Sequence, residues 1–383
     1  MKKKAIITSI FIIFICIFLA AGLFIHLQKN KVAETKVHVT KSVGLRSHPV
    51  IEKSLNEKIT IGAIGDVLMH EVVYKDALNG HHYNFDPMFA NVKSLLQKPD
   101  VLTANQESTL GGIELGLSSY PTFNSPHEVA DALVQTGVDI VSTANNHSLD
   151  KGEKGIDSEM HYLNSIGLPH VGSFVNEQDR EKLRILNKNG IKIAFLAYSY
   201  GTNGIPIPDH KDFLVNLINR DIMKKEIERA KKVADVVVMS IHWGIEYQRV
   251  PDEEQKDLAN FLANEGVDVI FGSHPHVLQP MDWITRKDGK KTFVIYSLGN
   301  FISGQTGENK NIGGMATIDI TKNVSKKGNT ITLSNPVFYP TFVSSHDFKH
   351  YRVVPMEKAA AFGLNNAIGK YKEIQNHMYQ WLR

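Results

Sequence analysis

Residues 267–276 read VDVIFGSHPH, an apolar run that ends in glycine, serine and two histidines. The short apolar part, 267–271, is typical of a buried strand. Six further runs of this kind alternate with helical patterns, as a mainly parallel sheet with crossover helices requires. They lie at 59–64, 101–103, 138–142, 191–197, 236–240 and 293–296. The sequence therefore predicts an α/β fold in which helices flank a sheet core.

Helix start and stop signals support this alternation. Ser125, Pro126 and Glu128 predict a capped helix start, and Gly137 predicts the end of the same helix. Apolar residues spaced three or four apart, or a terminal glycine, predict further helices at 156–166, 223–234 and 253–265.

The N-terminus predicts a membrane anchor. Three lysines at 2–4 precede residues 5–25, which carry no charge and would span about 31 Å as a helix, the thickness of a bilayer's hydrocarbon core. The lysines are expected to stay in the cytoplasm, so we predict a single-pass protein of the cell membrane whose C-terminal domain is extracytoplasmic. Small residues at 19–22 leave a cleaved signal peptide as the alternative.

The chain divides accordingly into five predicted segments. These are a cytoplasmic tail at 1–4, a transmembrane anchor at 5–25, a tether at 26–58, the main domain at 59–355 and a helical C-terminal segment at 356–383. Cys16 is the one cysteine and falls in the predicted anchor. The outer domain therefore has no disulfide and depends on its core or on a metal for stability.

Composition limits the classes of partner. With 383 residues and 42% hydrophobic side chains, the chain can bury a full core. Residues 1–58 hold ten Lys/Arg and three Asp/Glu, a charge of +7, whereas the whole chain carries +3, so the remainder carries −4. An acidic domain disfavours a nucleic-acid groove, and no nucleic-acid partner is expected.

Polar side chains follow five of the predicted strands. They are Asp66 after the first strand, Asn105 and Glu107 after the second, Asn145, Asn146 and His147 after the third, His242 and Trp243 after the fifth, and His274 and His276 after the sixth. The carboxyl ends of strands are where sites assemble in open α/β sheets. Taken singly, each of these motifs is usually a turn or a loop. One shared metal or catalytic site explains all five together.

The residue types indicate which metal would bind. In the segment His274-Pro275-His276, expected to be extended, both imidazoles can project to the same side. Asp66 and Glu107 add hard anionic oxygens, and an asparagine adds a neutral one. This mixture suits Mn, Fe or Zn rather than Ca. The sequence has no Gly-x-Ser-x-Gly elbow and no phosphate-binding P-loop, so serine or cysteine hydrolase chemistry is not expected.

Six segments in order resemble the CapA family of capsule proteins. They are IGAIGDVLMH (61–70), TANQES (103–108), STANNHSLDKG (142–152), SIHWGIEY (240–247), FGSHPHVLQP (271–280) and YSLGNF (296–301). The family looks like a variant of the calcineurin-like metallophosphoesterases. The resemblance covers roughly 59–302, with a looser match at 340–355, and it implies a metallophosphoesterase-like sheet core.

Carried over position by position, the resemblance implies two divalent ions. Asp66 would bind the first ion with His276, Glu107 would bridge both, and Asn146, His242 and His274 would bind the second. Leu68 stands where the phosphoesterase pattern has a histidine, and Glu107 stands where it has an aspartate. One metal position is therefore expected to be weak or absent. His70 is left outside the ligand set.

The resemblance also implies catalytic and pocket residues. His147 would act as a general acid or stabilise the transition state, and Asp150 would orient it. The implied substrate-binding residues are Asn105, Asn145, Trp243, Ser297 and Asn300. The expected reaction class is hydrolysis or transfer at a phosphoryl or acyl centre.

Three functions follow from these expectations. The first is a component of poly-γ-glutamate capsule biosynthesis or export at the outer face of the cell membrane, working with membrane-bound synthetase and export proteins on the anionic polymer. The second is an anchored metallophosphoesterase or amidase unrelated to capsule. The third is a scaffold without activity that keeps a degenerate metal site.

Overall fold

The computed structural model describes residues 55–307, 309–326 and 328–382. Residues Lys53–Arg383 form one compact unit. The predicted cytoplasmic tail, the predicted anchor and most of the predicted tether lie outside the described residues. Within the described part of the chain, none of the helices combines the length and the apolar character needed to cross a membrane.

The first sheet joins the N-terminal strands to the C-terminal ones. Its order is β16 (Lys349–Pro355), β15 (Gly328–His346), β14 (Ile312–Ser325), β1 (Leu55–Leu68), β4 (Val101–Gln106), β5 (Ile140–Ser142) and β6 (His170–Val171), with β13 (Asn300–Ser303) paired to the end of β1. Strands β1, β4, β5 and β6 run parallel, whereas β14, β15 and β16 add antiparallel neighbours. A two-stranded hairpin, β2 (Leu78–Asn79) and β3 (His82–Tyr83), stands apart.

The second sheet holds the middle of the chain. Its order is β11 (Leu278–Thr285), β12 (Lys291–Leu298), β10 (Val269–Ser273), β9 (Val236–His242), β8 (Ile191–Ser199) and β7 (Arg184–Lys188). The four inner strands are parallel and both edge strands are antiparallel. The prediction of one mainly parallel sheet is therefore wrong, because the strands form two mixed sheets.

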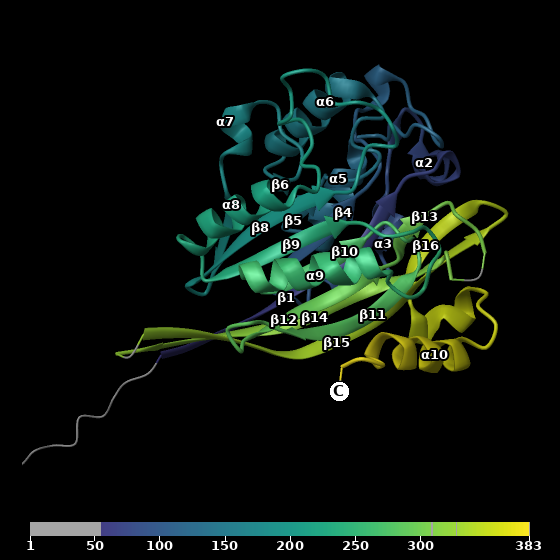
Figure 1. Ribbon diagram of the computed structural model, residues 1–383. Coiled ribbons are helices and arrows are strands. Elements are labelled where there is room, and N and C mark those ends of the chain that lie inside the picture. Colours follow the sequence, from purple (N-terminus) through teal and green to yellow (C-terminus); the bar gives the residue numbers. More distant parts are fainter. Residues whose placement is uncertain (1–54, 308, 327, 383) are drawn as a thin grey trace, which may run out of the picture. The chain divides into compact units, whose positions relative to one another are not determined.

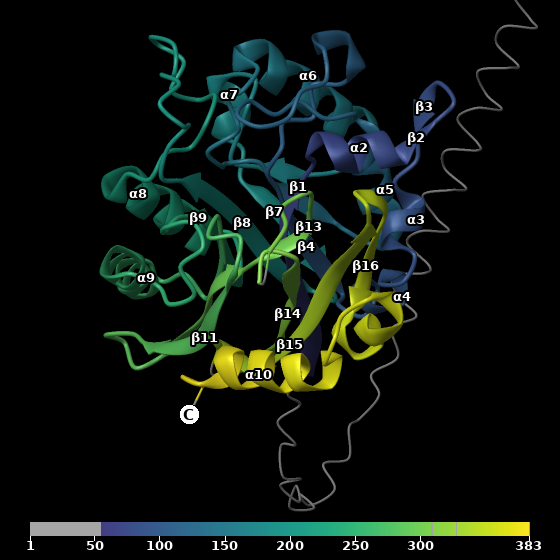
Figure 2. The same cartoon turned by 90° about the vertical axis from the view of Figure 1, so that its right-hand side faces the viewer.

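Helices cover the outer faces of the two sheets. They are α2 (Glu71–Ala77), α3 (Asp86–Phe89), α4 (Lys93–Leu96), α5 (Glu128–Thr136), α6 (Gly152–Ser165), α7 (Glu177–Arg180), α8 (Arg220–Lys231), α9 (Glu253–Glu265) and α10 (Ala367–Tyr379), with 3₁₀ turns at Ile113–Leu115 and Met356–Phe362. Figure 2 shows α8 and α9 on one outer side and α3, α4 and α5 on the other. In Figure 1, α10 lies beside β11 and β15.

Alternation along β9 shows how the second sheet is buried on both faces. Val236 and Val238 face a large core shared with the first sheet, whereas Val237 and Met239 face a second core under α8 and α9. Because successive strand residues point to opposite faces, a strand covered on both sides reads as an unbroken apolar run. This burial fixes the sheet and so fixes where the strand ends lie.

Two local boundaries differ from the expectation. Strand β1 begins at Leu55, so the last four residues assigned to the tether pair with β14. Helix α5 begins at Glu128 after His127, without a side-chain cap, and Ser125 instead donates its hydroxyl to Ser108 Oγ at 2.9 Å. The predicted end of α5 is confirmed, since Gly137 adopts φ 107°.

Candidate metal centre

The strand ends of both sheets meet at one edge. Asp66 lies near the end of β1, Glu107 directly follows β4, and His242 ends β9. Gly65 permits the close approach that places Asp66, because a Cβ at position 65 would lie 1.9 Å from Gly299 O. The Asp66 N–H then donates to the same carbonyl at 2.9 Å. Polar residues far apart in sequence are thereby brought to one buried place.

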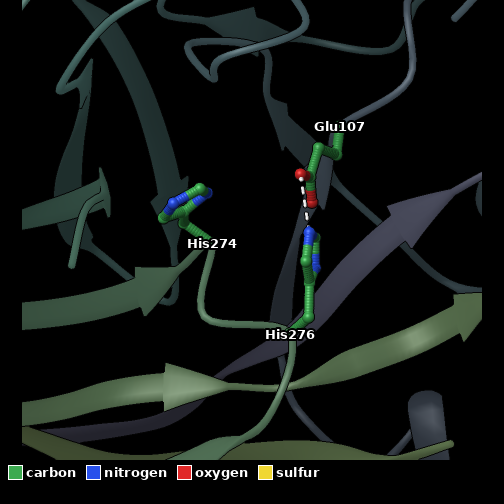
Figure 3. A group of neighbouring side chains, drawn as sticks. All are labelled: Glu107, His274 and His276. Atoms are coloured by element: carbon green, nitrogen blue, oxygen red, sulfur yellow. Dashed lines mark ion pairs between the residues drawn. The ribbon is translucent and has the colours of Figure 1, made fainter. Parts of the chain in front are cut away.

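Glu107, His274 and His276 form the nucleus of the site. One potential ligand atom from each lies within 4.8 Å of the others, and all three residues are buried. Figure 3 shows the side chains facing a common space, with His276 Nε2 3.5 Å from Glu107 Oε1. The centroids of the two histidine rings lie 6.0 Å apart. Two imidazoles and one carboxylate are a donor set that Zn, Mn or Fe accepts.

The backbone around the two histidines is not extended as predicted. His274 has φ 97° and His276 has φ 57°. A side chain at positive φ costs roughly 1–3 kcal/mol and is retained at functional sites where the surroundings fix it. The left-handed backbone, rather than an alternating strand, directs both rings toward Glu107.

Asp66 and Asn105 extend the nucleus on the side of the first sheet. Asp66 Oδ2 lies 3.0 Å from His276 Nδ1, and Asp66 Oδ1 accepts a hydrogen bond from Asn105 Nδ2 at 2.8 Å. The same Asn105 amide nitrogen lies 3.5 Å from Glu107 Oε2. Asn105 therefore positions both carboxylates from one amide group.

Asn146 and His242 form the opposite wall. Asn146 Oδ1 lies 2.8 Å from His242 Nε2, and His242 Nδ1 lies 3.0 Å from Ser273 Oγ. His242 Nε2 is also 3.7 Å from Glu107 Oε1, and the His242 and His274 rings are 4.8 Å apart. The structure thus brings all six predicted metal ligands into one cluster.

Two buried atoms that lack a hydrogen bond indicate that these residues fit a cation. In the described part of the chain, Glu107 Oε1 and His274 Nδ1 are buried and have no hydrogen-bond partner. A buried polar atom without a partner costs about 1–3 kcal/mol, and a metal ion would satisfy both atoms. The site is therefore a candidate divalent metal centre.

The charges of the buried groups are balanced through His276. Burial raises the pKa of Glu107 well above its ordinary range. Burial alone would lower the pKa of His276, but the carboxylates of Glu107 and Asp66 raise it to about 9. Burial and the neighbouring histidines lower the pKa of His274 to about 3. Without metal, the His276 proton offsets the carboxylates, and a cation would displace that proton.

His147 and Asp150 lie beside the cluster as a pair. His147 Nδ1 is 2.7 Å from Asp150 Oδ2, which also accepts the Phe123 N–H at 2.5 Å. The Phe123 ring meets the His147 ring edge-on with centroids 4.7 Å apart. Asn145 Oδ1 accepts the His147 N–H at 2.9 Å, so the backbone of the loop is fixed as well.

Asn145, Ser297 and Trp243, three of the predicted pocket residues, are buried and hydrogen-bonded to the backbone. Asn145 Nδ2 donates to Gln106 O, Ser297 Oγ accepts the Gly299 N–H, and both side chains are buried. Trp243 is 2% exposed in the second core, where its indole N–H donates to Tyr296 O at 2.9 Å. Direct ligand contact by these three residues stays a prediction.

Residues that the sequence analysis did not predict for the site also contact it. The Tyr200 ring lies 4.7 Å from the His274 ring, and Asn203 Oδ1 accepts from Asn146 Nδ2 at 3.2 Å. The Tyr247 ring lies 6.2 Å from that of His276. Tyr247 stands inside the segment 240–247, but Tyr200 and Asn203 lie in a loop without a motif and gave no signal.

His70, left outside the ligand set, lies near the cluster. Its Nδ1 accepts the Gly304 N–H at 3.2 Å, and its ring meets Phe123 at 5.0 Å. Burial, with smaller effects of His276 and His147, lowers the pKa of His70 to about 4. His70 is therefore a neutral imidazole near the site at neutral pH.

The fold and the site together define an α/β protein with a candidate divalent metal centre at the strand ends. The family model "Bacterial capsule synthesis protein PGA_cap" matches residues 60–305, so the chain belongs to this family. The predicted relationship to CapA proteins is confirmed.

Two curated relatives and one solved structure illustrate the similarity. The chain is 30% identical over 286 residues to the capsule biosynthesis protein CapA of Bacillus anthracis, covering 72% of this chain and 66% of that protein. It is 26% identical over 277 residues to the PGA biosynthesis protein CapA of Bacillus subtilis, covering 68% of each. The chain thus spans about two thirds of the length of these relatives. The calcineurin-like phosphoesterase YfkN of Bacillus subtilis is 17% identical, with a TM-score of 0.46 over 74% of this chain and 91% of that one.

Proposed function

We propose that the protein is a metal-dependent hydrolase or transferase that acts on poly-γ-glutamate during capsule biosynthesis or export. Membership of the capsule synthesis family supports a role in capsule formation. The observation that carries the chemistry is the buried cluster of Glu107, His274 and His276, in which two buried atoms lack a hydrogen bond and fit a cation.

Metal binding would be shared by the two walls of the site. Asp66, Glu107 and His276 form one group of donors, and Asn146, His242 and His274 form the other. Two neighbouring groups of donors favour two divalent ions, with Glu107 between them. When bound, such ions lower the pKa of water and stabilise negative charge on the reacting group.

His147 would supply the proton that the leaving group needs. Asp150 accepts a hydrogen bond at Nδ1 of His147, which leaves Nε2 as the nitrogen that can exchange a proton with the substrate. Because Asp150 is held in turn by the Phe123 N–H, the ring has one preferred orientation. Holding a general acid in the reactive orientation accounts for much of the rate enhancement that it provides.

We further propose that the enzyme works at the outer face of the cell membrane. The uncharged residues 5–25 would anchor the chain, and the lysines before them favour a cytoplasmic N-terminus. Membrane-bound synthetase and export proteins would be its partners, since they handle the same polymer. Cysteine labelling of an introduced outer residue in intact cells tests this orientation, and labelling only after lysis contradicts it.

One observation favours a second candidate, a binding scaffold with a weakened metal site. Leu68 occupies the position where the phosphoesterase pattern has a histidine, and it is buried with no polar atom to offer. Loss of a ligand there would weaken the ion bound near Asp66. Stoichiometric metal without turnover would favour this candidate.

Turnover measurements separate these functions. Protein beginning at Lys53, which keeps the whole of β1, is assayed with γ-glutamyl oligomers and with generic phosphodiesters and amides. His274→Ala and His147→Ala are compared with wild type, and His161→Ala, which changes an exposed histidine of α6 outside the cluster, is the control. We expect metal-dependent cleavage of γ-glutamyl bonds that both site variants lose. Cleavage of phosphodiesters alone would contradict the capsule substrate.

A further inference from the structure

Gln305 and Lys310, between β13 and β14, are tied to the candidate metal centre through Asn300. Asn300 Nδ2 donates to Lys310 O at 2.8 Å and lies 3.4 Å from His276 O. The same amide donates to Gln305 Oε1 at 3.0 Å. One buried asparagine therefore links the loop to the backbone of a candidate ligand, and the position of Lys310 follows that of the site.

The side chain of Lys310 is held on an aromatic ring that faces the site. Its Nζ lies 3.8 Å from the centroid of the Tyr247 ring, a cation–π contact. The Tyr247 ring is in turn 6.2 Å from the His276 ring. The Tyr247 N–H donates to Pro275 O at 2.7 Å, between the two candidate ligands. The ammonium group and the His276 ring thus both lie next to the Tyr247 ring.

The phenol under the lysine stays neutral. Burial, with Glu246 and its hydrogen bond to the hydroxyl, raises the pKa of Tyr247 to about 12. Gln305 Nε2 lies 3.4 Å from the same hydroxyl. Tyr247 therefore presents a neutral ring face that positions a cation without neutralising it.

The charge of Lys310 is not used elsewhere in the described part of the chain. Lys310 is half-buried and forms no ion pair among these residues, whereas Arg249, near Tyr247 in the neighbouring loop, is paired with Glu373 at 3.0 Å. A positioned, unpaired cation beside a candidate active site is suited to an anionic group of a ligand. Because the domain carries a net negative charge, it has no broad positive field to attract an anion. An anionic ligand would therefore depend on a single positioned cation such as Lys310.

We propose that Lys310 binds a free carboxylate of the substrate next to the bond that reacts at the metal centre. This inference rests on the proposed function and adds the group by which the substrate is recognised. A γ-linked glutamyl chain keeps one free α-carboxylate on every residue, so each unit entering the site offers the anion that Lys310 requires. Glu246, whose charge acts on the Tyr247 hydroxyl, would repel a misplaced carboxylate and so favour one orientation.

Equilibrium binding tests this inference independently of turnover. Full-length protein is titrated, with and without added metal, with a γ-glutamyl oligomer and with the same oligomer whose α-carboxylates are converted to amides. We expect wild type to bind the free acid about tenfold more tightly, and Lys310→Met to lose that preference while binding the amide unchanged. Lys310→Arg retains the charge and should keep most of the preference.

Lys287→Met is the matched control, because Lys287 is exposed and its side chain forms no hydrogen bond or ion pair with the residues that the structure describes. Equal affinity of wild type for acid and amide would overturn the proposal, as would equal weakening of both ligands by Lys310→Met. A Lys310→Met effect on inorganic phosphate alone would assign the residue to a phosphate group and would also overturn it. Absence of turnover with the acid preference intact would count against the proposed reaction but not against this contact.

Discussion

Glu159 is predicted to make the stability of the domain depend on pH. The residue lies in α6, its side chain is buried, and its Oε1 atom has no hydrogen-bond partner among the described residues. Burial raises the pKa of Glu159 from 4.5 to about 8, and a hydrogen bond with the backbone of Leu110 offsets only part of this effect. The neighbouring Thr109 donates its hydroxyl to His147 O at 2.8 Å, so this carboxyl underlies the loop that supports His147.

The direction and size of the effect follow from the two pKa values. The unfolded chain releases the Glu159 proton above about pH 4.5, whereas the folded chain keeps it until about pH 8. The unfolded state therefore binds fewer protons across this range, and the free energy of unfolding falls as pH rises. At about 1.4 kcal/mol for each tenfold change, the full loss is on the order of 5 kcal/mol.

Glu159→Gln removes this titration while keeping the shape of the side chain. Urea unfolding of protein beginning at Lys53, followed by circular dichroism from pH 5 to pH 8, should show a midpoint that falls more in wild type than in the variant. The variant should be the more stable protein at pH 8. Glu254→Gln, at an exposed position of α9, is the control and should follow wild type. Equal pH dependence of wild type and Glu159→Gln would show that the Glu159 carboxyl does not cause the effect.

Three further predictions concern the site. Asp150→Asn should lower turnover about a hundredfold or more with metal content unchanged, because His147 loses the acceptor that orients it; unchanged turnover would remove Asp150 from the reaction. Gly65→Ala should destabilise the fold by about 3 kcal/mol and impair metal binding, since its Cβ would meet Gly299 O and displace Asp66; a stable, metal-replete variant in a denaturation assay would contradict this. Chelation should lower the midpoint of thermal unfolding. Restoring free metal to about 100 times its Kd should raise the free energy of unfolding by about 2.7 kcal/mol; a midpoint insensitive to chelator would mean that no ion stabilises the fold.

The strand ends could be predicted because a strand buried on both faces appears in the sequence as a continuous apolar run. Val237 and Met239 belong to a run that is apolar on both faces, so a strand with His242 close to its end is visible without a structure. Parallel strands then place their carboxyl ends at one edge, and the six predicted ligands meet there. The fold was less predictable in the C-terminal part, where long antiparallel strands depend on pairing between distant segments.

The orientation of individual groups could not be read from spacing. His274 and His276 reach Glu107 through left-handed backbone, which a strand pattern does not indicate. Tyr200 and Asn203 come from a loop whose path is set by tertiary contacts rather than by a local motif. Such residues are found only once the surrounding elements are placed.

We expect the buried strand-end cluster to bind a divalent metal. The most direct test is the metal content of purified protein, measured by mass spectrometry after equilibration with Mn, Fe and Zn, for wild type, His274→Ala and the control His161→Ala. We expect stoichiometric metal in wild type and in His161→Ala and a substantial loss in His274→Ala. Absence of bound metal in wild type, or equal metal in all three proteins, would contradict the assignment of the site.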